Sequence, residues 1–199
     1  MAKKGKKVGV SVITSIICLV LSLLMIATFF MPTFVDGNDD NKVAYNGVTL
    51  TQAAFMSEED CEEALANSLN IVKYNEEERE EFGRLVAAYT YANNEDNGGF
   101  KAAAILNIAV LIVGAVGAVF SVISLLKKKT NLGLIIATLV GVVAAIALTI
   151  VSTGFVSFVY EEALIKDLVT LTTGAGVWIA LVGAVLACAS AVAGKVAKK

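Results

Sequence analysis

Four long apolar runs without a single charged side chain divide the sequence, at residues 8–31, 102–126, 132–158 and 173–193. About 20 helical residues are enough to cross the roughly 30 Å hydrocarbon core of a bilayer. Because lipid offers no hydrogen-bond partners, a crossing segment must satisfy its backbone groups internally, as a helix does. The sequence therefore predicts an all-α membrane protein built on a four-helix transmembrane bundle.

The charged residues between these runs predict on which side of the membrane each connection lies. Ten lysines and no acidic residue occupy the segments 1–7, 127–131 and 194–199. Lysine and arginine are retained on the cytoplasmic side, so these three segments are expected there. Both termini are then cytoplasmic, and the segments 32–101 and 159–172 are outside. This topology accounts for the basic tails, and we expect no nucleic-acid partner.

The larger outer segment is strongly acidic and contains signals for secondary structure. Residues 32–100 carry 15 acidic and four basic side chains, a net charge of −11. The pair Asn46-Gly47 stands between two short apolar stretches, and such a pair favours the two-residue turn of a β-hairpin. We therefore predict a small extracellular α(+β-hairpin) loop domain, with the hairpin turn at this pair.

Two helix starts follow the predicted hairpin. Ser57 precedes three acidic residues, and Asn75 stands three positions before Glu78, and both patterns are typical of a capping box. Beyond each start, apolar and small residues recur at helical spacing, which predicts one packing face on each helix. The members are Cys61, Leu65, Ser68, Leu69 and Val72 on the first helix and Phe82, Leu85, Val86 and Tyr89 on the second.

The sequence lacks the residues on which most enzyme and transporter mechanisms depend. It has no histidine, and its four apolar runs contain no ionisable side chain. Coupled transporters place ionisable groups or Gly/Pro breaks inside the membrane, whereas Pro32, the single proline, follows the first run. The glycines lack the strand-loop-helix context of a phosphate cradle. We therefore expect no enzyme activity, no catalytic residue and no cofactor.

One short acidic motif is an incomplete candidate for a metal site. Asp36, Asn38 and Asp40 match the first, third and fifth positions of an EF-hand calcium loop. The sixth position is Asn41 instead of glycine, and the twelfth is Gly47 instead of the bidentate glutamate. The interpretation we favour is a polar linker that attracts cations diffusely, without a defined site.

Small residues recur at every fourth position of three runs, a spacing that lets helix backbones approach closely. Packing within one bundle is the interpretation we favour. Oligomerisation is the alternative, because the last run has two small faces and one neighbour requires only one. The predicted helix-packing residues are Gly114, Ala118, Gly133, Ala137, Gly141, Ala145, Gly176, Ala180, Gly183, Ala184 and Ala187.

Polar side chains inside the runs offer two further interpretations. Ser11, Ser15, Cys18 and Ser22 share one face of the first run. Such a face either lines a polar path or bonds to the preceding turn and to neighbouring helices, and we favour the second. Asn107, near the outer end of the second run, is expected to bond between helices.

The three cysteines do not form a disulfide framework. Cys18 and Cys188 lie within apolar runs, and Cys61 is the only cysteine of the outer segment. No disulfide within that segment is therefore available. We expect Cys61 at a buried helix position, and an intermolecular disulfide is the alternative.

The layout resembles that of the claudin-type four-span proteins, with cytoplasmic ends, a large first outer loop and a short second one. The first-loop signature of that family is a tryptophan and Gly-Leu-Trp followed by two cysteines. This chain has no tryptophan and one cysteine, Cys61, in the corresponding segment. The resemblance therefore implies the four-span topology and no particular function.

These observations predict a multi-pass protein that acts through contacts. The favoured function is an accessory, scaffold or interaction subunit that displays the acidic segment to a membrane or extracellular protein, or to further copies of itself. The alternatives are a subunit of a small oligomeric channel or transporter, and an immunity or stress protein that sequesters a toxin. The lysine-rich tails and the lack of an N-glycosylation sequon favour a bacterial cell membrane.

Overall fold

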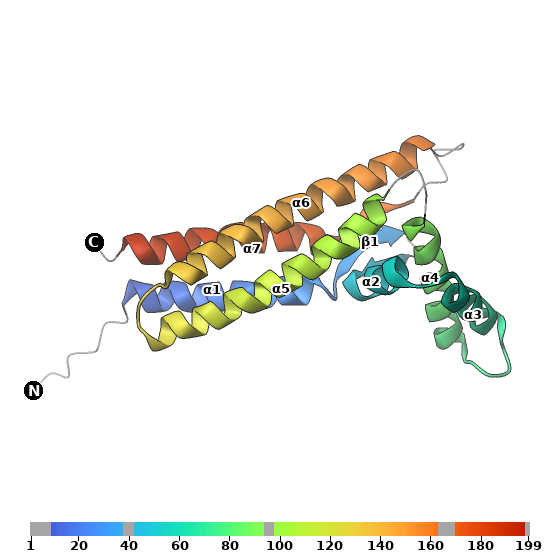
Figure 1. The fold of residues 1–199 in the computed structure, drawn as a ribbon, viewed down its shortest axis with the longest axis horizontal. Helices are drawn as coiled ribbons and strands as arrows, with labels where there is room; N and C mark the ends of the chain where they lie inside the picture. Colours follow the sequence, from blue (N-terminus) through green and yellow to red (C-terminus); the bar gives the residue numbers. More distant parts are fainter. Residues whose placement is uncertain (1–8, 38–41, 94–97, 163–169, 198–199) are drawn as a thin grey trace, which may run out of the picture. The chain divides into compact units, whose positions relative to one another are not determined.

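The computed structural model describes residues 9–37, 42–93, 98–162 and 170–197. Within these ranges, four helices are long and apolar enough to cross a membrane, so the chain is a helical multi-pass membrane protein. They are α1 (Val10–Thr28), α5 (Gly99–Leu126), α6 (Leu132–Glu162) and α7 (Ala175–Val196), shown in Figure 1.

The helices begin and end within a few residues of the predicted runs. α1 ends at Thr28, whose carbonyl accepts a hydrogen bond from the Met31 N–H at 3.1 Å. Pro32, expected to end the first run, instead opens a strand, where its missing N–H is tolerated. α6 continues to Glu162, beyond the predicted end at residue 158.

The chain forms two compact units. The first unit contains residues 1–27, 110–146 and 179–199, and the second contains 28–109 and 147–178. In the first unit, the helices pack through positions without bulky side chains. A Cβ placed on Gly114 would lie 3.2 Å from the Cβ of Met25, and one placed on Gly141 would lie 3.1 Å from the Cε of Met25. The glycines therefore let α5 and α6 approach α1 closely.

The turn between α5 and α6 has a defined hydrogen-bond pattern. The Lys128 N–H donates to the Leu125 carbonyl at 3.1 Å, and the Lys129 N–H donates to the Ser124 carbonyl at 3.0 Å. This pair of bonds is the Schellman motif that commonly ends a helix, and it requires a left-handed residue. Lys128 takes that conformation with a φ of 49°. The backbone hydrogen bonds therefore fix the turn, although its three lysines carry like charges.

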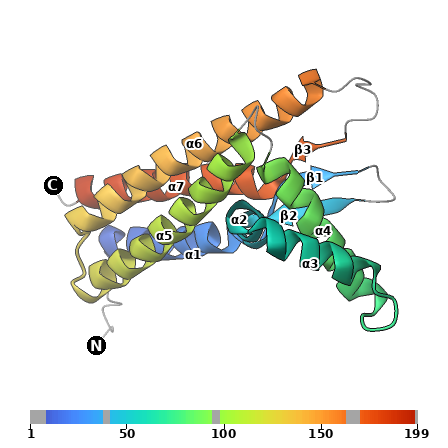
Figure 2. The ribbon, with the colours of Figure 1, turned by 45° about the vertical axis from the view of Figure 1, so that its right-hand side comes forward.

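The second unit contains a three-stranded sheet. Its strands are β1 (Pro32–Asp36), β2 (Val43–Asn46) and β3 (Thr172–Thr173), in the order β2-β1-β3 with both pairs antiparallel. Figure 2 shows β1 between its two neighbours. β2 follows β1 in the connection between α1 and α5, whereas β3 comes from the connection between α6 and α7. The sheet thus joins segments that are distant in the sequence.

The predicted hairpin turn at Asn46-Gly47 is wrong, because this pair begins a helix. The Asn46 side chain accepts a hydrogen bond from the Thr49 N–H at 3.0 Å and caps α2 (Gly47–Phe55). The Gly47 N–H donates to the Phe29 carbonyl at 2.8 Å. Asparagine suits a helix N-cap as well as a turn, and here the cap prevails. The antiparallel pair is instead formed by β1 and β2.

Two acidic helices complete the connection between β2 and α5. α3 (Glu58–Leu69) begins at a capping box of Ser57 and Asp60, and α4 (Glu76–Ala92) begins at a capping box of Asn75 and Glu78. Both predicted helix starts are therefore confirmed. α4 packs against both α2 and α3.

The packing face predicted for α3 is correct in part, because Cys61 and Ser68 are half-buried but the larger apolar members are not. The buried residue of this helix is Ala64, whereas Leu65 and Leu69 are exposed. Val72 lies beyond the end of the helix and is also exposed. A small side chain on α3 thus faces the rest of the unit, and the larger apolar ones are left outside.

The left-handed Lys128 gives a prediction for stability. Lys128→Gly should raise the free energy of unfolding by about 0.5–1 kcal/mol, because glycine adopts a positive φ without the steric penalty of a side chain. Urea unfolding in detergent, followed by circular dichroism, would measure the change. Lys129→Gly is the matched control, since Lys129 lacks a positive φ, and it should give no gain. Equal gains in the free energy of unfolding for both variants would contradict the left-handed conformation of Lys128.

A second prediction concerns the close approach at Gly47. A Cβ at this position would lie 2.5 Å from the Phe29 ring and 2.7 Å from its carbonyl oxygen. Gly47→Ala should therefore lower the free energy of unfolding by about 1–3 kcal/mol. Gly83→Ala in α4, where a Cβ would meet nothing within 4 Å, should instead stabilise by about 0.5–1 kcal/mol. Thermal unfolding of both variants measures the two changes in stability, which should have opposite signs.

Candidate functional site

Five aromatic side chains form the centre of the second unit and are called the aromatic cluster here. Phe34, Phe100 and Phe155 come from β1, α5 and α6, are buried, and have ring centroids 5.5–5.7 Å apart. Tyr91 of α4 stacks on Phe100 at 6.0 Å, and Tyr45 of β2 meets Phe100 edge-on at 6.4 Å. Each such pair adds about 0.5–1.5 kcal/mol beyond burial. The cluster therefore holds α4 and the sheet against α5 and α6.

A carboxylate at the end of β1 adds a polar link beside the cluster. The Tyr91 hydroxyl donates to Asp36 Oδ2 at 3.2 Å, and the Thr170 hydroxyl donates to Asp36 Oδ1 at 2.6 Å. The Gly37 N–H donates to Thr170 Oγ1 at 2.8 Å. Hydrogen bonds to a charged acceptor are stronger than neutral ones. Asp36 thus links α4 to the segment that leads into β3.

Burial also controls the chemistry of the two tyrosines. Burial, and then the charge of Asp36, raises the pKa of Tyr45 to about 12. The same two causes raise the pKa of Tyr91 above the ordinary phenol range. Both phenols therefore stay protonated to a higher pH than an ordinary tyrosine, and Tyr91 keeps the hydrogen that it donates to Asp36.

The candidate metal motif is only partly within the described residues. Asn38 and Asp40 lie outside them. Asp36 uses both carboxylate oxygens as acceptors for the Tyr91 and Thr170 hydroxyls. Across the described ranges, no group of three or more Asp, Glu, Cys or His side chains is placed to hold a metal ion. In the structure, Asp36 therefore links β1 to α4 and to the segment before β3.

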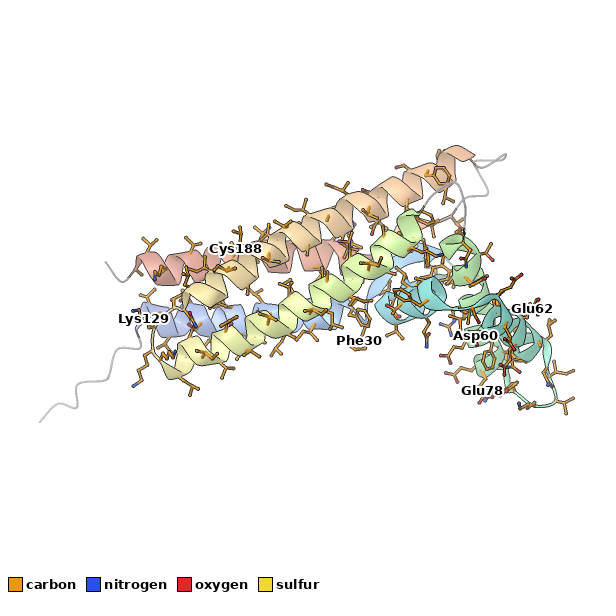
Figure 3. The ribbon with its side chains drawn as sticks, in the orientation of Figure 1. Phe30, Asp60, Glu62, Glu78, Lys129 and Cys188 are labelled. Atoms are coloured by element: carbon orange, nitrogen blue, oxygen red, sulfur yellow. The ribbon has the colours of Figure 1, made fainter. Side chains whose placement is uncertain are left out.

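α3 and α4, with the turn between them, make a surface called the acidic hairpin here. α3 carries five acidic residues and no basic one, and α4 carries five acidic residues and two arginines. Each helix has three acidic residues in its first turn, where the helix dipole favours negative charge. The hydrogen bond from the Ser57 hydroxyl lowers the pKa of Asp60. Asp60, Glu62 and Glu78 mark this surface in Figure 3.

The acidic hairpin ends in exposed apolar side chains, called the tip patch here. It consists of Leu65 and Leu69 on α3 and Ile71 and Val72 in the turn to α4. Val72 is 94% exposed, and Leu69 and Ile71 are 73% exposed. Grouped apolar side chains on a polar surface are a common feature of interaction sites. Helix stability explains the acidic first turns of the hairpin, but it does not explain the exposed apolar side chains of the tip patch.

Two cavities lie along α4, with volumes of about 420 and 380 Å³. Arg84 lines both of them, and Glu80 and Tyr45 line the larger one. Thr49, which lines the smaller one, donates its hydroxyl to Asn46 at 3.3 Å. The larger cavity lies between β2 and α4. The smaller cavity also borders α2.

The serine face of α1 is buried by neighbouring parts of the first unit. Ser11, Ser15, Cys18 and Ser22 are all buried. The Ser15 hydroxyl donates to the Ser11 carbonyl one turn earlier at 2.7 Å, the Ser11 hydroxyl lies 3.1 Å from that of Thr130, and the Cys18 thiol donates to the Ala187 carbonyl at 3.4 Å. The bonding interpretation of this face is confirmed for these three side chains.

Asn107 bonds differently from the expectation. Its amide donates to the Ala103 carbonyl of its own helix at 3.0 Å, and its carbonyl oxygen accepts from the Thr33 hydroxyl of β1 at 3.4 Å. The expected bond between helices is therefore replaced by a bond to a strand. Sequence reasoning missed this partner because β1 was not predicted.

The predicted helix-packing residues are placed in the interior of the chain. Ala118 and Gly133 are half-buried, and the other nine are buried. Both small faces of α7 are used within one chain, since Ala180 and Ala184 on one face and Gly183, Ala187 and Ala191 on the other are all buried. The second face of α7 therefore no longer argues for a second copy.

Cys61 lies on α3 and is half-buried, where a buried position was expected. The three cysteines are free in the structure. Burial, and then the carboxylates of Glu62 and Glu58, raises the pKa of the Cys61 thiol. The thiolate, which is the reactive form of cysteine, is therefore disfavoured at this position.

Comparison of the chain with protein-family models, with curated proteins and with solved structures found no match.

The Asp36 link gives a third prediction. Tyr91→Phe should lower the free energy of unfolding by about 1 kcal/mol, and Asp36→Ala by about 2–3 kcal/mol, because the second change leaves two hydroxyls without their acceptor. The double variant should be less destabilised than the sum of the two by about 0.5–1.5 kcal/mol. Urea unfolding of the four proteins measures this coupling. Strict additivity would show that the two side chains do not interact.

Proposed function

We propose that the chain is a non-catalytic accessory or scaffold subunit of the plasma membrane. Its termini are cytoplasmic, residues 32–101 are outside, and it acts by presenting the acidic hairpin to a protein partner. The observation that carries the proposal is the tip patch, which places exposed apolar side chains at the end of two acidic helices. The lysine distribution supports the orientation.

The surroundings of the tip patch indicate the chemistry of the partner. The two helices carry ten acidic and two basic side chains, and Lys73 lies in the turn between them. A second copy of the same surface would meet it with like charge, and so would a membrane rich in anionic lipid. A protein surface with basic side chains around an apolar centre complements it. The partner is therefore a basic membrane or extracellular protein.

The rest of the second unit supports a docking role by holding the hairpin in place. Phe100 and Phe155 belong to α5 and α6, and Tyr91 connects α4 to both of these side chains. An interface that is fixed before binding loses less conformational entropy on association than a disordered one. The aromatic cluster therefore fixes α4 before a partner binds. α3 is held in turn because it packs on α4.

The channel alternative has less support from the described residues. Ser15 and Ser22, which would line the path, are buried among neighbouring parts of the same unit. A Cβ placed on Gly117 would lie 2.7 Å from the Ser22 hydroxyl oxygen, so α5 covers this face closely. A path along these serines would require α1 and α5 to separate.

The proposal is tested by a mild-detergent pull-down of the tagged full chain from its native membrane, with the mass of the complex measured. The wild type should carry a stoichiometric foreign protein with a basic surface. Leu69→Ser with Val72→Ser should reduce its recovery by about tenfold, as expected when apolar anchors are removed from an interface. Phe55→Ser is the matched control, because Phe55 is also exposed but lies on α2, outside the hairpin.

Three outcomes would contradict the proposal. The first is a homo-oligomer without a foreign protein, which would direct attention to the pore alternative and to liposome flux. The second is equal recovery with the patch variant and the control. The third is turnover of a substrate, or movement of a solute, by the purified chain alone.

A further inference from the structure

We propose that the first unit holds an anionic phospholipid, with the phosphate in a lysine-lined cavity at the α5–α6 turn and an acyl chain in the apolar groove between α5 and α6. This site is separate from the acidic hairpin and does not depend on the partner proposed for it. The cavity, the groove and the helix face that runs from one into the other support this site.

The headgroup cavity has a volume of about 300 Å³ and is lined by three lysines from two elements. Lys127 and Lys129 belong to the α5–α6 turn, and Lys195 belongs to the last turn of α7. The sequence segments around them, 127–131 and 194–199, contain no acidic residue that would neutralise them. A phosphate group has several oxygens that accept hydrogen bonds from ammonium groups, and basic pockets between transmembrane helices are suited to lipid headgroups.

The backbone beneath the lysines is held in place before any ligand arrives. The Schellman motif fixes Lys127 to Lys129, and the Asn131 N–H donates to the Ser124 hydroxyl at 3.1 Å. Asn131 then caps α6, because its side chain accepts from the Gly133 N–H at 3.1 Å. Figure 3 marks Lys129 at this turn. The site therefore requires ordering of the lysine side chains and not of the chain that carries them.

The acyl groove has a volume of about 350 Å³ and no polar lining. Val113, Val116 and Phe120 of α5 form one wall, and Ile136 and Val140 are on the α6 wall. Gly133 forms part of the groove, where a Cβ would lie 2.6 Å from the Phe120 ring. An apolar chain fits such a groove without leaving a polar group unsatisfied.

One face of α6 connects the cavity to the groove. Leu132 lines the headgroup cavity, and Ile136 and Val140 line the groove. Residues four positions apart are neighbours on one helix face, so these three side chains form a continuous row. A lipid with its phosphate among the lysines thus has an apolar path for its chain along this row. A free phosphate ion would use the cavity alone, and a transmembrane helix would use the groove alone.

The test uses the purified, delipidated full chain in detergent and native mass spectrometry with added lipid. Phosphatidylglycerol should occupy the protein about tenfold more than phosphatidylcholine with the same acyl chains, because only the first has a net negative headgroup. Replacing Lys127, Lys129 and Lys195 together by alanine should remove this preference. Lys128→Asn is the matched control, since it removes a charge from the same turn outside the cavity and asparagine tolerates a positive φ.

The groove is tested separately, with Val140→Trp to fill it. This variant should bind phosphatidylglycerol about tenfold less while its lysines are intact, and Val116→Trp on the opposite wall provides a second variant if the first fails to fold. Loss of binding in the tryptophan variants supports a lipid. Unchanged binding in them, with competition by glycerol 3-phosphate, would show a phosphate site without a lipid. Equal occupancy by the two lipids, or unchanged binding in the triple lysine variant, would also overturn the proposal.

Discussion

The contact between Phe34, Phe100 and Phe155 is the interaction on which the second unit depends. The three side chains are separated by 66 and 55 positions in the sequence, as their numbers show, and they meet with centroids 5.5–5.7 Å apart. Tyr45 and Tyr91 extend the contact to β2 and α4. The Asp36 link and the packing of α4 on α2 add to this contact. The position of the acidic hairpin within the unit thus depends on aromatic packing together with the contact between α4 and α2.

The first unit depends on a different principle, since lipid provides no hydrophobic force between helices. Its helices approach through glycine and alanine, and its hydroxyls bond to nearby carbonyls. The face with Cys18 and Ser22 illustrates this, because both side chains are buried and Cys18 bonds to the carbonyl of Ala187. The polar part of this unit is the lysine-rich turn between α5 and α6. Its Schellman motif holds three like charges close together, and a bound anion would stabilise them.

The sequence was sufficient for the parts of the fold that depend on local physics. Apolar runs predicted the four long helices, and the capping signals at Ser57 and Asn75 predicted the starts of α3 and α4. The sequence was insufficient where partners are distant. Asn46-Gly47 satisfies both a hairpin turn and a helix cap, and the choice depends on Phe29, whose carbonyl binds the Gly47 N–H. The predicted face of α3 failed at Leu65, Leu69 and Val72, because the small Ala64 rather than a larger apolar side chain packs inward. Neither the tip patch nor the lysine cavity follows from periodicity, since each depends on which side chains are left exposed after packing.

The proposed function depends on a protein partner that binds the tip patch of the acidic hairpin. Site-specific photo-crosslinking from position 72 in living cells tests it most directly, because Val72 is the most exposed large apolar side chain of the described residues. We expect one dominant adduct, a foreign protein whose crosslinked segment is basic and contains apolar residues. An adduct with a second copy of the chain or with lipid, or no adduct above that of position 55 on α2, would contradict it.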